Sequence, residues 1–198
     1  MKEILIAVAL AVVLSVAGFY TWKVLGSKAP PVGSQVAADT RSSYATSTYS
    51  VKYPSDFTLD THYAYDQFGP KKLIRGTKFI VPPTMATGTN LSADTGISVE
   101  QLPRAKKCTG DIYLQANVTA RTISNGGITY SFASSTGAAA GNVYEEQVFA
   151  LATSSPCTAV RYFIHSGNIG NYPAGTVRAF DRGALLAAFD NIRQSIRF

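Results

Sequence analysis

The sequence predicts an α+β fold: an antiparallel β-sheet of about six strands packed against a C-terminal α-helix, preceded by a single transmembrane helix. Three observations support this prediction. Apolar and polar residues alternate in several short runs between residues 48 and 166, as in half-buried strands. After residue 181 the apolar residues follow the helical period. Near the start of the chain, residues 4–22 form an apolar run without charge.

The apolar run over residues 4–22 has the length of a membrane-spanning helix. At a rise of about 1.5 Å per residue, a helix over this run spans roughly 28 Å, close to the hydrocarbon thickness of a bilayer. Three aromatic residues at positions 19–22 are typical of the interface where a helix leaves the membrane. The small residues at 15–17 leave a cleaved signal peptide open as the alternative. Residues 1–26 are therefore assigned to a transmembrane anchor or an uncleaved signal.

The residues after the anchor divide into a linker and one domain. Residues 27–47 are small and polar and contain a Pro pair, which is typical of a flexible linker. Residues 48–198 are enough for a single domain with a substantial core. Residues 29–198 carry 15 Lys and Arg against 11 Asp and Glu, a mildly basic net charge of +4. The basic residues are scattered, so no nucleic acid is expected as a partner.

The two cysteines, Cys108 and Cys157, are interpreted as one disulfide. Neither belongs to a CxxC or CxxH motif, so a metal site is not expected. A bridge between them closes a loop of about 50 residues, which contributes on the order of 4 kcal/mol. Since disulfides persist outside the cytosol, the domain is expected on the extracytoplasmic side of the cell membrane, periplasmic or extracellular. Two buried free thiols are the alternative, and the lysines beside the anchor leave its orientation open.

In the first half of the domain, short strands are predicted where apolar and polar residues alternate. Tyr49, Val51 and Tyr53 alternate in the first strand, which Pro54 ends. Residues 61–69 are aromatic without a clear period and are expected to form a loop or a short helical turn. Further strands are predicted at residues 57–59, 78–81 and 97–102, and a short helix at residues 108–116.

The second half of the domain is predicted to form an antiparallel meander. Residues 121–124 and 128–133 flank Asn125-Gly-Gly127, and Asn-Gly is typical of the type I′ turn of a hairpin. Strands at residues 144–151 and 158–166 follow, separated by a segment rich in turn-forming residues.

The last segment of the chain is predicted to be a helix. Leu185, Phe189, Ile192 and Ile196 are spaced at i, i+4, i+7 and i+11, which places them on one helical face. Asp181 is expected to cap the first turn. We expect the apolar face to pack on the sheet.

Two stretches of the domain resemble known families. The run Tyr49-Ser-Val-Lys-Tyr-Pro-Ser-Asp-Phe57 resembles the opening of PsbP/Mog1-like domains, although Phe57 stands where that pattern usually has Trp. The C-terminal half, with Asn168-Ile-Gly-Asn-Tyr-Pro173 and Gly175-Thr-Val177, resembles uncharacterised bacterial membrane-anchored envelope proteins and lipoproteins. The resemblance implies a non-catalytic accessory or binding module on a sheet backed by helices. It supplies no catalytic residue.

No catalytic residue, metal or other cofactor is predicted. Asp94-Thr-Gly96 matches the aspartic-protease tripeptide, but no apolar strand precedes it and the chain has no second copy, which favours a plain turn. His62 and His165 are the two histidines, and no Gly-x-Ser-x-Gly elbow frames a nucleophile. His165 shares its strand face with Arg161 and Phe163, which favours a polar surface position.

The candidate binding residues are aromatic and polar side chains of loops and strand faces. Tyrosines bind glycans and partner proteins well because their rings are apolar and their hydroxyls polar. The function expected is a membrane-tethered, extracytoplasmic, non-catalytic binding or accessory module for a protein or an envelope component. The alternatives are an envelope hydrolase or protease that uses Asp94 or His165, and a self-assembling structural subunit. The candidates are Tyr63, Tyr65, Arg161, His165, Asn168, Asn171 and Tyr172.

Overall fold

The structure of the chain, a computed structural model, describes residues 40–114 and 118–198. The part from Thr40 to Phe198 forms one structural unit. The predicted transmembrane helix and most of the predicted linker lie outside the described residues. Within the described ranges, no helix has both the length and the apolar character needed to cross a membrane.

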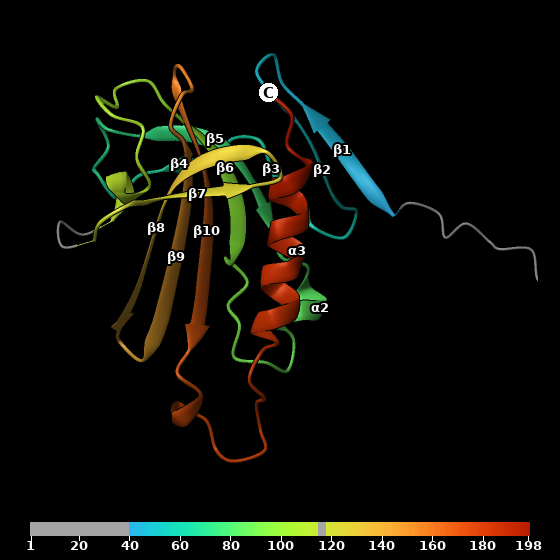
Figure 1. Cartoon of the computed structure of the whole chain (residues 1–198). Coiled ribbons are helices and arrows are strands. Elements are labelled where there is room, and N and C mark those ends of the chain that lie inside the picture. Colours follow the sequence, from blue (N-terminus) through green and yellow to red (C-terminus); the bar gives the residue numbers. More distant parts are fainter. Residues whose placement is uncertain (1–39, 115–117) are drawn as a thin grey trace, which may run out of the picture. The chain divides into compact units, whose positions relative to one another are not determined.

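An eight-stranded sheet forms the body of the described domain (Figure 1). Its strands follow the order β3-β5-β6-β10-β9-β8-β7, with β4 paired to β5, and neighbouring strands are antiparallel. The bounds are β3 Thr58–Asp60, β4 Ala64–Tyr65, β5 Ile74–Ile80, β6 Gly96–Leu102, β7 Arg121–Asn125, β8 Ile128–Ala139, β9 Asn142–Leu151 and β10 Cys157–Gly167.

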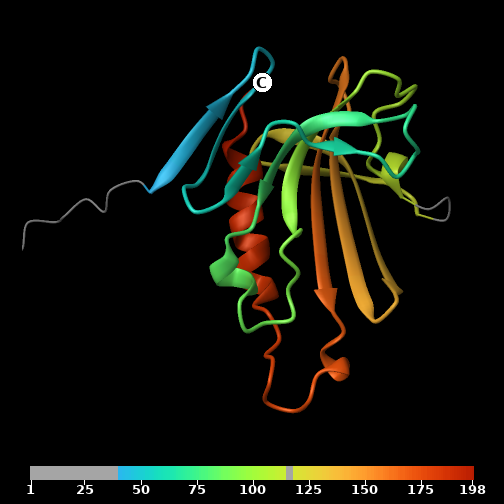
Figure 2. The same ribbon diagram turned by 180° about the vertical axis from the view of Figure 1, so that it is seen from behind.

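A two-stranded hairpin and one long helix complete the fold. The hairpin, β1 (Arg41–Ala45) and β2 (Ser50–Pro54), lies beside helix α3 (Arg182–Ser195), as Figures 1 and 2 show from opposite sides. Three single turns connect other elements: α2 (Pro83–Ala86), η1 (Gly110–Tyr113) and η2 (Ile169–Asn171). The predicted α+β class with a C-terminal helix is confirmed.

Helix α3 begins and packs as its sequence predicts. The Asp181 carboxylate accepts a hydrogen bond of 2.9 Å from the amide three residues later, which satisfies a donor of the first helical turn. Leu185, Phe189, Ile192 and Ile196 are all buried in the main core. The apolar face of the helix therefore lies on the sheet.

The apolar face of α3 also includes a charged side chain, which its residue type does not predict to be buried. Arg193 of α3 is buried, and its Nε donates to the Tyr162 hydroxyl of β10 at 2.8 Å. Its Nη2 donates to Asp190 at 2.8 Å, and its guanidinium carbon lies 4.3 Å from the ring centroid of Phe149. The Asp190 carboxylate pairs the charge and the rings pack against the guanidinium, while Nη1 is buried without a hydrogen-bond partner in the described part of the chain.

The prediction of about six strands is wrong, because short segments acquire strand structure by pairing. Residues 41–45, which the sequence assigns to the linker, form β1 through pairing with β2. Residues 64–65, expected in a loop or helical turn, pair with β5 as β4. Neither segment carries an alternating pattern long enough to predict a strand alone. The helix predicted at residues 108–116 is the single turn η1.

The turn between β7 and β8 is shifted by one residue from the predicted Asn-Gly pair. Asn125 pairs with Ile128, so the two turn residues are Gly126 and Gly127. Both have positive φ, 59° and 78°, as a type I′ turn requires. The hairpin itself is confirmed.

Candidate functional site

The face of the sheet opposite α3 carries the candidate site. Because side chains alternate along a strand, Arg161, Phe163 and His165 of β10 share this face, while Tyr162 between them enters the main core. The antiparallel register places Glu146 of β9 beside Phe163. Charged and aromatic side chains from neighbouring strands therefore meet on one surface.

A pocket of about 540 Å³ lies on this face, and we call it the open-face pocket. Small-molecule sites in proteins commonly have volumes of about 300–1,000 Å³. The walls come from β4 with its flanking residues, from β5, from the ends of β8 and β9, and from β10. The side chains on which the chemistry depends are Tyr63, Tyr65, Asp66, Lys78, Asp94, Tyr144, Glu146, Arg161 and Phe163.

Arg161 forms the floor of the open-face pocket and is 3% exposed. Its Nε donates to Glu100 Oε1 at 3.2 Å, and its Nη1 donates to Glu146 Oε2 at 3.2 Å. Its Nη2 donates to the Tyr63 hydroxyl. Glu100 is 0% exposed, and it also accepts a hydrogen bond of 2.7 Å from the Ser98 hydroxyl. The carboxylates neutralise the cation, and the hydrogen bonds to Glu100 Oε1 compensate for part of the lost water, while Glu100 Oε2 is buried without a partner among the described residues.

Aromatic rings enclose the Arg161 guanidinium. Its central carbon lies 4.6 Å from the ring centroid of Tyr65, and 5.6 Å from those of Tyr113 and Phe163. The Tyr65 and Tyr113 rings meet edge to face, with centroids 5.3 Å apart. Contacts of this kind attract a cation to the ring faces and fix its orientation. Rings on several sides therefore fix the position of the Arg161 guanidinium at the floor of the pocket.

The predicted disulfide between Cys108 and Cys157 is present and helps to hold one of these rings. It ties the segment before η1 to the start of β10, with the two Cα atoms 5.2 Å apart. Gly110 of η1 lies so close to β8 that a Cβ there would be 2.6 Å from the Ala133 amide nitrogen. The bridge and this close approach place Tyr113 against Arg161.

A second charged group contains Lys78, Asp94 and His165. Lys78 Nζ donates to the backbone carbonyl of Asp94 at 2.5 Å and lies 5.3 Å from the ring centroid of Phe163. The Asp94 carboxylate contacts His165 Nδ1 at 2.8 Å, and the His165 ring stacks on Tyr144 with centroids 4.6 Å apart. Burial lowers the pKa of the Lys78 ammonium, and the charge of Asp94 opposes that change. His165 therefore positions two side chains that line the pocket.

The surroundings of the second His165 ring nitrogen bear on the alternative of a hydrolytic site. Its Nε2 is buried and has no hydrogen-bond partner within the described ranges. Consequently the Asp94–His165 pair contacts no serine or threonine hydroxyl through that atom. In the same part of the chain, no cluster of three or more His, Cys, Asp or Glu side chains is arranged to hold a metal ion.

Some of the predicted site residues lie together at the open-face pocket, and others do not. Tyr63, Tyr65 and Arg161 line the open-face pocket, and His165 contacts two of its lining residues. The three remaining candidates lie in the segment around η2, where they have structural contacts. The Asn168 side chain accepts from the Gly170 amide, the Asn171 side chain donates to the Gly141 carbonyl, and the Tyr172 hydroxyl lies against Gly167. Their role in binding stays a prediction.

Sequence reasoning did not include Lys78, Tyr144, Glu146 or Asp66 among the binding residues. Tyr144 and Glu146 alternate on β9 as Arg161 and Phe163 do on β10, so the two-residue period was a usable signal. Lys78 and Asp66 carry no such signal. They reach the pocket because β5 and the residues after β4 lie close together in the fold.

The free energy of unfolding is expected to fall steeply above pH 10. Burial raises the pKa of Tyr63, Tyr113 and Tyr162, and the Glu100 carboxylate adds to this effect at the first two. A tyrosine in the unfolded chain has a pKa of about 10, so above that pH the native state binds more protons. The contribution of these tyrosines to the free energy of unfolding is therefore fully present below pH 10. Above pH 10 it falls by up to about 1.4 kcal/mol for each tyrosine and each pH unit. Urea unfolding at pH 8.5 to 11 tests this expectation, and constant stability up to pH 11 would contradict it.

Comparisons with known proteins do not identify a family for the chain. No protein-family model and no curated protein matches the chain. A crystal structure from Bacteroides thetaiotaomicron VPI-5482 aligns with 80% of this chain at 11% sequence identity, with a TM-score of 0.43. The chain spans about half the length of that protein, 48%. Similarity at this level carries no argument about function, and the resemblance to PsbP/Mog1-like domains stays a prediction.

Proposed function

We propose that the chain is a membrane-tethered, extracytoplasmic binding module without catalytic activity, and that the open-face pocket holds its ligand. The observation that carries the proposal is the combination in one pocket of aromatic rings, carboxylates and a neutralised arginine. The tether is supported by the apolar run at residues 4–22. The extracytoplasmic location is supported by the disulfide, which persists in oxidising compartments.

The charges in the pocket disfavour an anionic ligand. The cations Arg161 and Lys78 face the carboxylates of Asp66, Asp94 and Glu146. Arg161 is already paired with carboxylates, and the Lys78 ammonium already donates to a backbone carbonyl. The carboxylates would therefore repel an anion that enters the pocket, and Arg161 is already paired and does not attract it strongly.

The side chains of the pocket suit a hydroxyl-rich ligand such as a sugar chain of the cell envelope. Tyr63, Tyr144 and Phe163 are half-buried, so part of each ring is open to the pocket. Such rings can stack on the apolar C–H faces of a sugar. The carboxylates of Asp66 and Glu146 accept hydrogen bonds from hydroxyl groups. Apolar surfaces with a few polar groups that fix orientation are typical of small-molecule sites.

A calorimetric titration tests the proposed ligand class. The full chain in neutral detergent is titrated with chitotetraose, cellotetraose and maltotetraose as probes. At least one is expected to bind saturably. Tyr144→Ala is expected to weaken that binding about tenfold because it removes a stacking surface. Asp66→Asn keeps the shape of an exposed side chain and is expected to weaken binding, because it removes the charge and one of the two acceptor oxygens.

The matched control is Phe198→Ala, which removes an exposed aromatic ring next to Tyr49, on the side of the main core. It is expected to leave binding unchanged. Absence of binding for all three probes contradicts a sugar ligand. Equal losses in the Tyr144 and Phe198 variants contradict the open-face pocket as its site.

An envelope hydrolase or protease is the second candidate, favoured by the 2.8 Å contact between Asp94 and His165. A catalytic pair of this kind requires a nucleophile or an activated water at the second ring nitrogen. If the chain hydrolyses any of the three saccharides, His165→Ala and Asp94→Asn should abolish the reaction. A binding module predicts intact saccharides after prolonged incubation.

A self-assembling structural subunit is the remaining alternative. It predicts that the full chain in detergent forms oligomers whose size grows with concentration. Light scattering measures this directly, and a constant monomer mass favours the binding module.

A further inference from the structure

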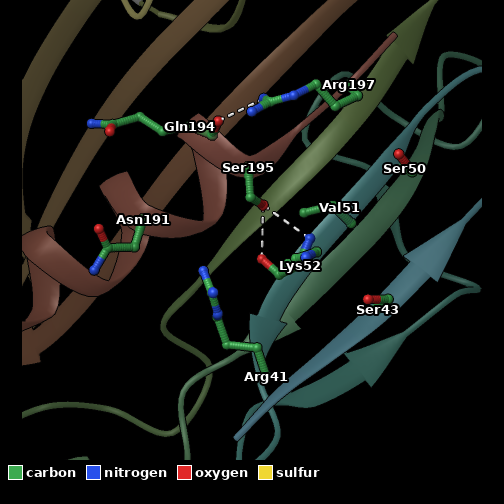
Figure 3. Close-up of a pocket in the computed structure, with 9 residues that line it drawn as sticks. All are labelled: Arg41, Ser43, Ser50, Val51, Lys52, Asn191, Gln194, Ser195 and Arg197. Atoms are coloured by element: carbon green, nitrogen blue, oxygen red, sulfur yellow. Dashed lines mark hydrogen bonds between the residues drawn. The ribbon is translucent and has the colours of Figure 1, made fainter. Parts of the chain in front are cut away.

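A second cavity, of about 510 Å³, lies between the β1–β2 hairpin and the C-terminal end of α3 (Figure 3). We call it the basic cavity because Arg41, Lys52 and Arg197 line it together with two side-chain amides and three serines. Its described lining contains no Asp or Glu. The open-face pocket has three carboxylates in its lining, so the two cavities have different charge.

Backbone hydrogen bonds fix the walls of the basic cavity. The Ser195 hydroxyl accepts from the Lys52 amide at 2.9 Å and lies 2.8 Å from the Lys52 carbonyl oxygen, as the dashed lines in Figure 3 show. The Ser50 and Arg197 backbones exchange two hydrogen bonds of 2.8 and 2.9 Å. The backbone of strand β2 and of the end of α3 is therefore held in place before any ligand arrives, which lowers the entropic cost of binding.

Hydrogen bonds at the end of α3 use only some of the N–H donors of Arg197. Its Nη1 donates to the carbonyls of Gln194 and Ile196 at 2.8 Å each, where the helix dipole favours a cation. A guanidinium has five N–H donors, and those on Nε and Nη2 of Arg197 make no hydrogen bond with the described residues. The Lys52 side chain is exposed, and its ammonium is likewise without a partner in that part of the chain. Donors therefore remain for a ligand.

We propose that the basic cavity binds a phosphate group. Guanidinium and ammonium groups form strong, charge-assisted hydrogen bonds with phosphate oxygens, and serine hydroxyls and side-chain amides add neutral donors. Among the described residues of the lining, no carboxylate repels the anion. The same chemistry occurs in an anionic lipid headgroup and in a soluble phosphate, so the source is decided by experiment.

Three probes test this proposal with the full chain in neutral detergent: inorganic phosphate, glycerol phosphate and dihexanoyl phosphatidylglycerol below its micelle concentration. Binding is measured by calorimetry at constant ionic strength. Lys52→Gln is expected to weaken binding of a phosphate probe about tenfold, because a charge-assisted hydrogen bond is lost. Lys106→Gln is the matched control, since Lys106 is an exposed lysine outside the lining of this cavity.

Each outcome decides the proposal. Saturable binding that Lys52→Gln weakens and Lys106→Gln leaves unchanged supports the basic cavity. Binding of the lipid alone then identifies a headgroup as the source, whereas binding of all three in competition identifies soluble phosphate. Absence of saturable binding, or equal losses in the two variants, overturns the proposal. Unchanged thermal unfolding of both variants excludes a folding defect, and the saccharide titrations remain an independent measure of the open-face pocket.

Discussion

Replacement of Arg161 by Met is expected to lower the free energy of unfolding by about 3–5 kcal/mol, the usual effect of removing one member of a buried ion pair. Arg161 and Glu100 are 3% and 0% exposed, and their charged atoms are 3.2 Å apart. Without the guanidinium, the Glu100 carboxylate stays buried with no opposite charge to compensate for its lost water. The Tyr63 hydroxyl and the Glu146 carboxylate also lose a partner. Urea unfolding of the full chain at pH 7 measures the difference.

Two further variants make this prediction specific. Arg161→Met with Glu100→Gln removes both charges, so the double variant is expected to be more stable than Arg161→Met alone. Arg182→Met is the matched control because Arg182 is a half-exposed partner of Glu145, and such a pair contributes about 0–1 kcal/mol. If Arg161→Met is no less stable than Arg182→Met, the ion pair does not stabilise the floor of the pocket.

Loss of the Cys108–Cys157 disulfide is expected to lower the free energy of unfolding by about 4 kcal/mol, since the bridge closes a loop of about 50 residues in the unfolded chain. The same change releases the segment before η1 from β10. Tyr113 then loses one of the constraints that place it against Arg161. We therefore expect reduction to weaken ligand binding in the open-face pocket as well as stability.

The measurement compares urea unfolding of the full chain before and after treatment with a phosphine reductant. The control is the Cys108→Ala, Cys157→Ala variant, whose stability should match that of the reduced chain and should not respond to the reductant. A loss below about 1 kcal/mol on reduction contradicts the chain-entropy argument for this bridge.

The elements of the fold that could be predicted from the sequence are those whose own residues carry the pattern. The face of α3 and the alternation of β2 are visible because one periodicity extends over the whole element. Strand β4 has two residues and β1 is held by its pairing with β2, so their structure depends on partners elsewhere in the chain. Arg193 lies four residues after Phe189 on the same face, but the burial of its charge depends on Tyr162 and Asp190, which the helical period does not reveal.

The candidate site could be predicted where its residues share one strand. Arg161 and His165 follow the alternation of β10, which a single sequence reveals. The contact between Asp94 and His165 joins residues 71 positions apart, and the ion pair of Arg161 with Glu100 joins residues 61 apart. Those contacts require the order of strands in the sheet, and neither local composition nor periodicity specifies that order.

The most direct measurement of the central claim is an amide chemical-shift map of the full chain in detergent during titration with the three tetrasaccharides. Ligand binding in the open-face pocket predicts shift changes concentrated at residues 63–67, at Tyr144 and Glu146, and at residues 161–165. Changes restricted to α3 and the β1–β2 hairpin, or no changes with any of the three saccharides, would contradict the claim.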